Sequence, residues 1–108
     1  MVLAACGRIA ADGTPQPAFA ITDTQVGGAA AVWDGTSYLV VWPQAAALFL
    51  APVTVSGSVG SPLQITTPTG SAVDTAPALA SDRAGTSLVA FERDDVTPQV
   101  LSVFVSRD

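Results

Sequence analysis

The chain is poor in the side chains that most often carry out catalysis. Its 108 residues include no histidine and one cysteine, and all four basic residues are arginines, so lysine is absent as well. Without an imidazole, a serine or cysteine nucleophile lacks its usual general base. Cys6 has no second cysteine with which to form an internal disulfide. These absences predict a protein that is not an enzyme and that holds no cofactor or metal.

Positive charge is equally scarce. The formal net charge is −5, with nine acidic residues against four basic ones. The basic residues are Arg8, Arg83, Arg93 and Arg107. They form no basic stripe that could neutralise phosphates, so nucleic acid is not an expected partner. The longest apolar stretch, residues 45–53, is far shorter than the roughly 20 residues of a membrane-spanning helix, so no transmembrane segment is expected.

The residue types that are abundant favour strands and turns. Hydrophobic residues make up 49% of the chain and charged residues 12%, which is enough apolar material for a core. Many of the apolar residues are valine, and threonine, serine, glycine and proline are plentiful. Because β-branched residues favour strands and the others favour turns, the composition predicts an all-β fold without helices.

Two internal echoes indicate a repeated unit. Residues 35–42 (GTSYLVVW) return, one residue shorter, as residues 85–91 (GTSLVAF), about 50 positions later. In addition, Asp-Gly-Thr at 12–14 corresponds to Ser-Gly-Ser at 56–58, an offset of about 44 that also relates two Ile-Thr pairs. We interpret residues 1–28 as the end of one repeat, with its third and fourth strands. A complete repeat then covers 29–76, and the first three strands of the next cover 77–108.

Each repeat is predicted to contain four short antiparallel strands. In the complete repeat these are residues 29–33, 37–42, 47–55 and a short strand ending at 65–66, and in the next they are 77–81, 87–91 and 100–106. Asp34-Gly35 is typical of a tight hairpin, which lengthens to residues 82–85 in the next copy. Loops are expected at 22–28 and 66–75, which are rich in turn-forming residues.

The second strand of the complete repeat decides between two architectures. Residues 38–42 are all apolar, so both faces of this strand must be buried. A blade of a β-propeller is covered on both sides by its neighbours, whereas a simple β-sandwich leaves one face of each sheet in water. We therefore expect about two propeller-like blades, with a compact β-sandwich as the alternative. Because propellers close with about four to eight blades, the chain is expected to be a fragment of a larger propeller.

The sequence also resembles a known type of repeat. Residues 31–42 (AVWDGTSYLVVW), followed by a strand and Val-Thr-Val-Ser-Gly at 53–57, resemble the repeats of large secreted bacterial proteins with an Asp-Gly-Thr-x-Tyr-Leu-Val-Val-Trp core. The resemblance covers almost the whole chain. It implies a β-propeller-like protein located outside the cell or on its surface, with neighbouring repeats as partners, and it implies no particular activity.

Three residues are the candidate ligand contacts. Trp33 adjoins a turn and its counterpart in the second copy is Ser81, so the fold does not require the aromatic ring there, and an exposed ring can stack on a sugar. Tyr38 and Trp42 are expected in the core. Glu92 lies beside Asp94 and Asp95 at the end of a strand, and paired carboxylates of this kind, which Asp82 could join in space, are the groups used in glycoside hydrolysis. Charged residues 92–95, however, are typical of a solvated hairpin tip.

These observations favour a non-enzymatic module that acts as a structural scaffold or as an adhesion surface for glycans or surface proteins. The alternative is a carbohydrate-binding or glycoside-cleaving propeller. Leu-Ala-Ala-Cys at 3–6 matches the pattern that is cleaved and lipidated in bacterial lipoproteins, but no charged and apolar leader precedes it. Cys6 is therefore interpreted as a thiol on a strand, with a lipid anchor through Cys6 as the alternative.

Overall fold

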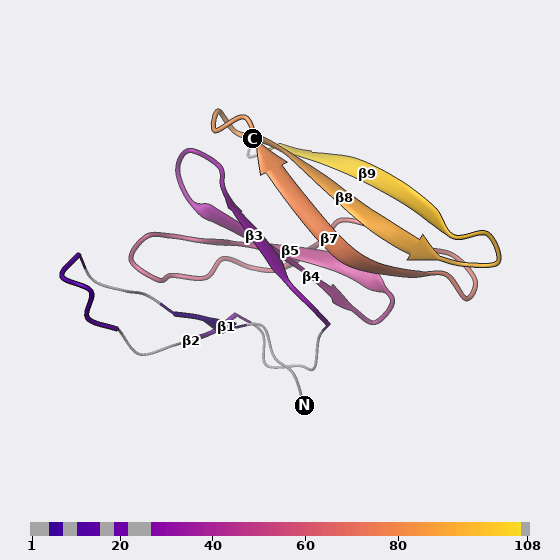
Figure 1. The fold of residues 1–108 in the computed structure, drawn as a ribbon, viewed down its shortest axis with the longest axis horizontal. Coiled ribbons are helices and arrows are strands. Elements are labelled where there is room, and N and C mark those ends of the chain that lie inside the picture. The colour runs from indigo at the N-terminus through magenta and orange to yellow at the C-terminus, as the bar shows by residue number, and fades with distance from the viewer. Residues whose placement is uncertain (1–4, 8–10, 16–18, 22–26, 107–108) are drawn as a thin grey trace.

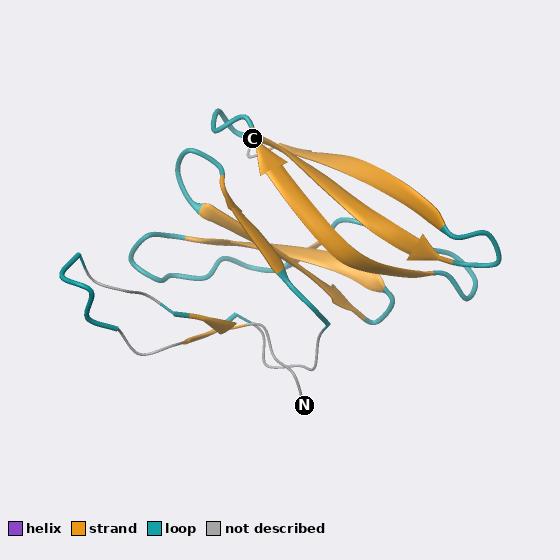
Figure 2. Ribbon diagram, in the orientation of Figure 1, coloured by secondary structure: helices purple, strands orange, loops and turns teal. Residues whose placement is uncertain are grey.

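The computed structural model describes residues 5–7, 11–15, 19–21 and 27–106. Within these ranges there are nine strands and no helix (Figures 1 and 2). The strands form three antiparallel sheets, of two, four and three strands, which stay open rather than closing on themselves. The prediction of an all-β antiparallel fold is confirmed. The four-stranded and three-stranded sheets are packed against each other.

The two-stranded sheet is a short hairpin at the start of the chain. It consists of β1 (Ala5–Cys6) and β2 (Phe19–Ala20), in which Ala5 lies opposite Ala20 and Cys6 lies opposite Phe19. The same pairing occurs 44 residues further on, where Phe49 lies opposite Gln64 and Leu50 opposite Leu63. The offset of 44 seen in the sequence therefore also relates two pairs of strands that share one register. The part of the predicted loop at 22–26 lies outside the described residues.

The four-stranded sheet follows the chain in order. Its strands are β3 (Ala30–Trp33), β4 (Tyr38–Gln44), β5 (Ala47–Val53) and β6 (Leu63–Gln64). All four were predicted to within a few residues. The turn before β4 contains Gly35 at a φ of 104°, a conformation that glycine adopts without steric cost.

The β4–β5 hairpin has a turn that the sequence does not signal. Its two loop residues, Ala45 and Ala46, have φ angles of 50° and 73°. Such primed turns usually contain asparagine or glycine, because a side chain disfavours positive φ. The carbonyl of Ala46 accepts a hydrogen bond of 2.8 Å from the amide of Asp74, so the turn is attached to the neighbouring sheet.

The three-stranded sheet has longer strands than predicted. It comprises β7 (Val73–Ser81), β8 (Thr86–Asp94) and β9 (Gln99–Ser106). The expected loop at 66–75 is therefore wrong for its last three residues, and Glu92, Arg93 and Asp94 belong to a strand rather than to a hairpin tip. A β-bulge between Thr75 and Ala78 accommodates Pro77, since proline cannot donate to a ladder.

The core of the four-stranded sheet lies on both of its faces. Val40 and Trp42 pack with Ile21 of the N-terminal segment on one face. On the other face, Leu39 and Val41 pack against Val89 and Phe91 of the three-stranded sheet. The predicted burial of both faces of this strand is confirmed. Tyr38, by contrast, was expected in the core and is 46% exposed, because it lies at the outer end of β4.

The two larger sheets stack along one strand. β7 lies across β3, β4 and β5, as Figure 1 shows. Side chains of β8 and β9 that point the same way, such as Val89 and Val103, reach the shared core. On the opposite face of the three-stranded sheet, Val100 and Phe104 are 76% and 77% exposed. Among the described residues, this sheet is therefore covered on one face only.

Candidate functional site

Trp33 lies at the end of β3 and forms an aromatic pair. Its ring packs edge-on against Tyr38, with 4.9 Å between ring centroids and 62° between ring planes. Trp33 is half-buried, whereas Tyr38 is exposed. Trp42, in contrast, is buried as expected, stacks on Phe49 at 6.5 Å, and donates a hydrogen bond from Nε1 to Gln44 Oε1. Trp33 and Tyr38 therefore offer a paired aromatic surface to a ligand.

Asp82 lies in the turn between β7 and β8, where its carboxylate organises the backbone. Oδ1 of Asp82 accepts hydrogen bonds from the amides of Ala84 and Thr86, at 2.7 and 3.1 Å. Asp34 does the same in the turn before β4, where its Oδ1 accepts two amide hydrogen bonds of 2.8 Å. The side-chain carboxylates of both residues therefore have a structural role as turn-stabilising acceptors.

The two turns lie side by side. A Cβ added to Gly35 would collide with the backbone of Arg83, which shows how closely the chains approach. Since Trp33 precedes one turn and Asp82 belongs to the other, both predicted contacts lie at the same end of the stacked sheets.

Glu92 lies near the other end of β8. It is exposed and lies opposite Thr75 on one side and Val100 on the other. Glu92 is six residue steps along β8 from Thr86, which corresponds to about 20 Å at about 3.3 Å per residue. The structure therefore brings Trp33 and Asp82 to one end and leaves Glu92 at the other. The backbone of Cys6 lies in β1, and its side chain is outside the described part of the molecule.

An open depression of about 290 Å³ adjoins Glu92. It is lined by Thr75, Glu92, Arg93, Asp94, Pro98, Gln99 and Val100. The two carboxylates at its rim are exposed, and the guanidinium of Arg93 is already engaged by Asp74. Such an open surface does not exclude water from a reacting group.

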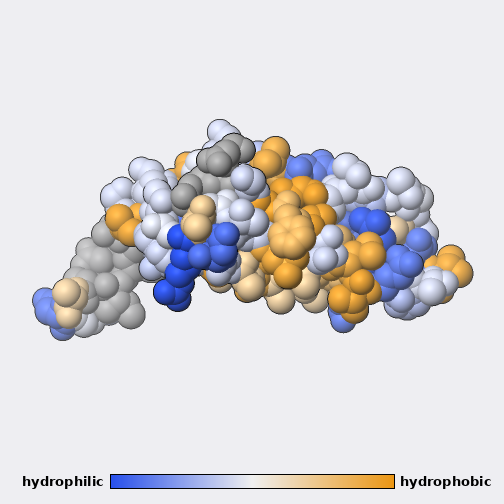
Figure 3. Space-filling view, turned by 90° about the horizontal axis from the view of Figure 1, so that it is seen from above, coloured by the Kyte–Doolittle hydropathy of each residue, from blue (hydrophilic) through white to orange (hydrophobic). Residues whose placement is uncertain are grey.

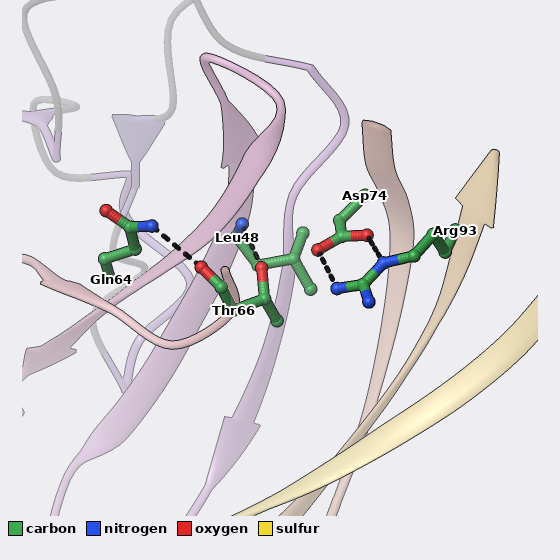
Figure 4. Close-up of polar contacts among 5 residues, drawn as sticks. All are labelled: Leu48, Gln64, Thr66, Asp74 and Arg93. Carbon is green, nitrogen blue, oxygen red and sulfur yellow. Dashed lines mark hydrogen bonds and ion pairs between the residues drawn. The ribbon is translucent and has the colours of Figure 1, made fainter. Parts of the chain in front are cut away.

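The most highly connected polar site joins β7 to β8. The side chain of Asp74 is fully buried, and its two oxygens accept hydrogen bonds from Arg93 Nε at 2.7 Å and Arg93 Nη2 at 2.9 Å (Figure 4). This bidentate geometry is the strongest form of a carboxylate–guanidinium pair. The Arg93 side chain is 24% exposed, so the pair has one buried and one partly hydrated member.

Thr66 extends this pair to the four-stranded sheet. Its hydroxyl oxygen accepts a hydrogen bond of 2.9 Å from the amide of Leu48 in β5, and its carbonyl accepts one of 2.8 Å from Gln64 Nε2 in β6. The Thr66 hydroxyl also contributes to lowering the pKa of Asp74, and the backbone amide of Asp74 donates a hydrogen bond of 2.8 Å to the carbonyl of Ala46 in the β4–β5 turn. The group formed by Thr66, Asp74 and Arg93, here called the inter-sheet clamp, thus connects both sheets (Figure 4).

The charges of the clamp stabilise each other. Burial on its own raises the pKa of Asp74, but the hydrogen bonds from Arg93 and Thr66 and the positive charge of Arg93 outweigh it, so the pKa is lowered. The hydrogen bond to Asp74 likewise raises the pKa of Arg93. A carboxylate that is held ionised and fully paired is unsuited to act as a general base. The clamp is therefore a structural site.

The sequence did not reveal the clamp. Asp74 and Arg93 are 19 residues apart, and the sequence pattern predicts a loop for Asp74 and a hairpin tip for Arg93. The usable signal was a pair of opposite charges on two adjacent strands, but it becomes visible only when the register of β7 on β8 is known.

Within the described ranges, no three His, Cys, Asp or Glu side chains are grouped so that they could hold a metal ion. The same part of the chain has no helix that is long and apolar enough to cross a membrane. No family model, curated protein or solved structure matches the sequence or the fold.

Proposed function

We propose that this protein is a non-enzymatic β-repeat module, secreted or on the cell surface, that acts as a structural scaffold or adhesion surface. The observation that carries the proposal is that the equivalent strands β4 and β8 turn matching apolar side chains in the same direction, toward the part of the chain that precedes them. In β4, Val40 and Trp42 face the preceding segment of the chain. In β8, Val89 and Phe91, which take the places of Val40 and Trp42 when the two hairpins are aligned on their turns, also face the preceding sheet.

This arrangement supports a stacked array over a self-contained sandwich. In a two-sheet sandwich one core lies between the sheets and the outer faces are solvated. Here a second core, built on Trp42 and Ile21, lies on the far face of the four-stranded sheet. The pairing of β1 with β2 recurs 44 residues later as the pairing of β5 with β6, in which Phe49 lies opposite Gln64, and this recurrence supports the same interpretation. Arrays of such units commonly serve as extended surfaces.

The polar residues also support a scaffold. Asp34 and Asp82 bind turn amides, and Asp74 with Arg93 connects the sheets. Each of these charged groups is thus involved in holding the backbone. The glycoside-cleaving alternative needs two carboxylates within about 10 Å of each other across the scissile bond. Asp82 and Glu92 lie near opposite ends of β8, and the neighbouring pair Glu92 and Asp94 lies exposed at the rim of an open depression.

Carbohydrate binding without cleavage is the second candidate. The observation that favours it is the pair formed by Trp33 and Tyr38, since Tyr38 is 46% exposed beside a partly exposed indole. Flat aromatic faces provide large apolar contact areas with a polar edge, which suits sugar rings.

A glycan panel separates the two candidates. We expect the scaffold to show no saturable binding to immobilised oligosaccharides and no release of reducing sugar. Trp33→Ala is the test variant, and Val96→Ala, at a side chain that is 96% exposed in a turn far from Trp33 along the chain, is the matched control. Saturable binding that disappears in the first variant and persists in the second would contradict the scaffold and establish the carbohydrate surface.

A further inference from the structure

The outer face of the three-stranded sheet is apolar and open. The outward side chains at its centre are mostly apolar, namely Ala78, Ala80, Leu88, Ala90, Val100 and Phe104, and Ser102 and Glu92 point the same way. Val100 and Phe104 are more than three-quarters exposed. Apolar side chains gather in the middle of the molecule when it is viewed from the side of β9 (Figure 3). Sheet faces of this kind are usually covered in a stable assembly.

The equivalent face of the four-stranded sheet is covered. When the two hairpins are aligned on their turns, so that the Trp33–Tyr38 pair matches the Ser81–Ser87 pair, Leu88 takes the place of Leu39 and Ala90 that of Val41. The registers extend the match to the next strand, where Val100 takes the place of Leu48. Leu39, Val41 and Leu48 are all buried beneath the three-stranded sheet. The described part of the chain therefore contains one interface in two forms, one of them covered and the other open.

We propose that the outer face of β7, β8 and β9 docks a further antiparallel sheet of the same repeat type, as the next unit of an array. This inference rests on the proposed function as a stacked scaffold. The occupant presents the face that covers the four-stranded sheet, with apolar side chains at the places of Leu79, Val89 and Phe91. Its identity follows from continuity with the interface that is already present.

The charge on the face argues against a second copy of this same face as the occupant. Glu92 lies on the outer side of β8, two residues beyond Ala90, and the described outward side chains of the sheet include no cation. A two-fold pairing of two open faces would remove two carboxylates from water without a partner. In the interface that is present, the place of Glu92 is taken by Pro43, which remains half-buried at the border.

An extended chain tests the proposal. Val53 and Val105 occupy equivalent places, since Pro52 lies opposite Leu39 and Phe104 opposite Leu88. We would produce residues 1–105 followed directly by a second copy of residues 54–108. This supplies a fourth strand for the three-stranded sheet and then a further sheet. Amide hydrogen exchange of β9 is expected to slow by about tenfold or more relative to the 108-residue chain, and the extended chain is expected to remain monomeric by light scattering.

A charged substitution makes the test specific. Phe104→Glu, made in the first copy, should leave the urea midpoint of the 108-residue chain nearly unchanged, because the side chain is 77% exposed. In the extended chain it should reverse the gain in exchange protection. Val96→Glu, at a side chain that is 96% exposed in the β8–β9 turn, is the matched control and should have no effect in either protein.

Two results would overturn the proposal. The first is an amide exchange pattern that does not respond to the added sheet: either the exchange rate of β9 is unchanged in the extended chain, or Phe104→Glu alters that rate equally in both proteins. The other is a dimer of the 108-residue chain that Phe104→Glu dissociates, since the occupant would then be a second copy. A Trp33-dependent glycan interaction would contradict the proposed function and would leave these measurements unaffected, so the two failures can be distinguished.

Discussion

The four-stranded and three-stranded sheets have similar sequences and different surroundings. Four consecutive residues of β4, from Leu39 to Trp42, are buried, whereas burial in β8 alternates along the strand. Leu39 and Leu88 hold the same place in the β3–β4 and β7–β8 hairpins, but Leu39 is 8% exposed and Leu88 is only partly buried. The difference lies in what covers each sheet, because both strands have apolar residues on both faces.

This comparison shows that an unbroken apolar strand indicates two neighbours, and that one of them need not be present. The N-terminal segment, through Ile21, covers one face of the four-stranded sheet, and the three-stranded sheet covers the other. The outer face of the three-stranded sheet has no such cover among the described residues.

Removal of Trp42 should produce the largest effect. Trp42 is 1% exposed in the core beneath Ile21, so Trp42→Ala is expected to lower the free energy of unfolding by about 3–5 kcal/mol. Phe104→Ala, at the open face, is expected to change it by less than about 0.5 kcal/mol. Urea denaturation followed by tryptophan fluorescence and circular dichroism measures both. Equal losses would show that Phe104 is covered in solution.

Breaking the inter-sheet clamp should have the second-largest effect. Asp74→Ala leaves the Arg93 guanidinium without its buried carboxylate partner, and we expect a loss of about 2–3 kcal/mol at neutral pH. Asp94→Ala removes an exposed carboxylate from β8, the strand of Arg93, and should change stability by less than about 0.5 kcal/mol. If both variants lose the same amount, the clamp does not hold the two sheets together.

The clamp also predicts a dependence on pH. The pKa of Asp74 is lower in the folded protein than its ordinary value of 3.8, so folding favours the ionised form. This contribution is fully present above the ordinary value and is lost as the pH falls through the lower, folded value. Acid titration of stability should therefore be less steep in Asp74→Ala than in the parent below pH 3.8. Parallel curves would contradict the proposed ionisation of Asp74.

Local sequence patterns were enough to predict most of the strands. The apolar runs at 38–42 and 87–91 and the glycine-containing turns before them define hairpins, because strand propensity and turn chemistry act over a few residues. These local patterns do not indicate which strand ends are covered by other parts of the molecule. Tyr38 was therefore placed in the core although it is 46% exposed.

The candidate site was less predictable because it depends on register. Trp33 and Asp82 share one end of the molecule only because the two turns meet at Gly35 and Arg83. Glu92 lies at the far end because β8 continues to Asp94, beyond the last apolar residue. The ion pair between Asp74 and Arg93 likewise requires the pairing of β7 with β8 to be known.

The smallest expected effect concerns the contact between the two turns. Gly35 and Gly13 both have positive φ, at 104° and 88°, so alanine at either position should cost about 1 kcal/mol from backbone strain. At Gly35 the added Cβ would also collide with the backbone of Arg83, whereas Gly13 has open space around it. Gly35→Ala should therefore destabilise the protein by about 1–2 kcal/mol, more than Gly13→Ala, in urea denaturation. Equal losses would mean that the turns do not touch in solution, and the two sheets would then be held together by the core and the clamp without this third contact.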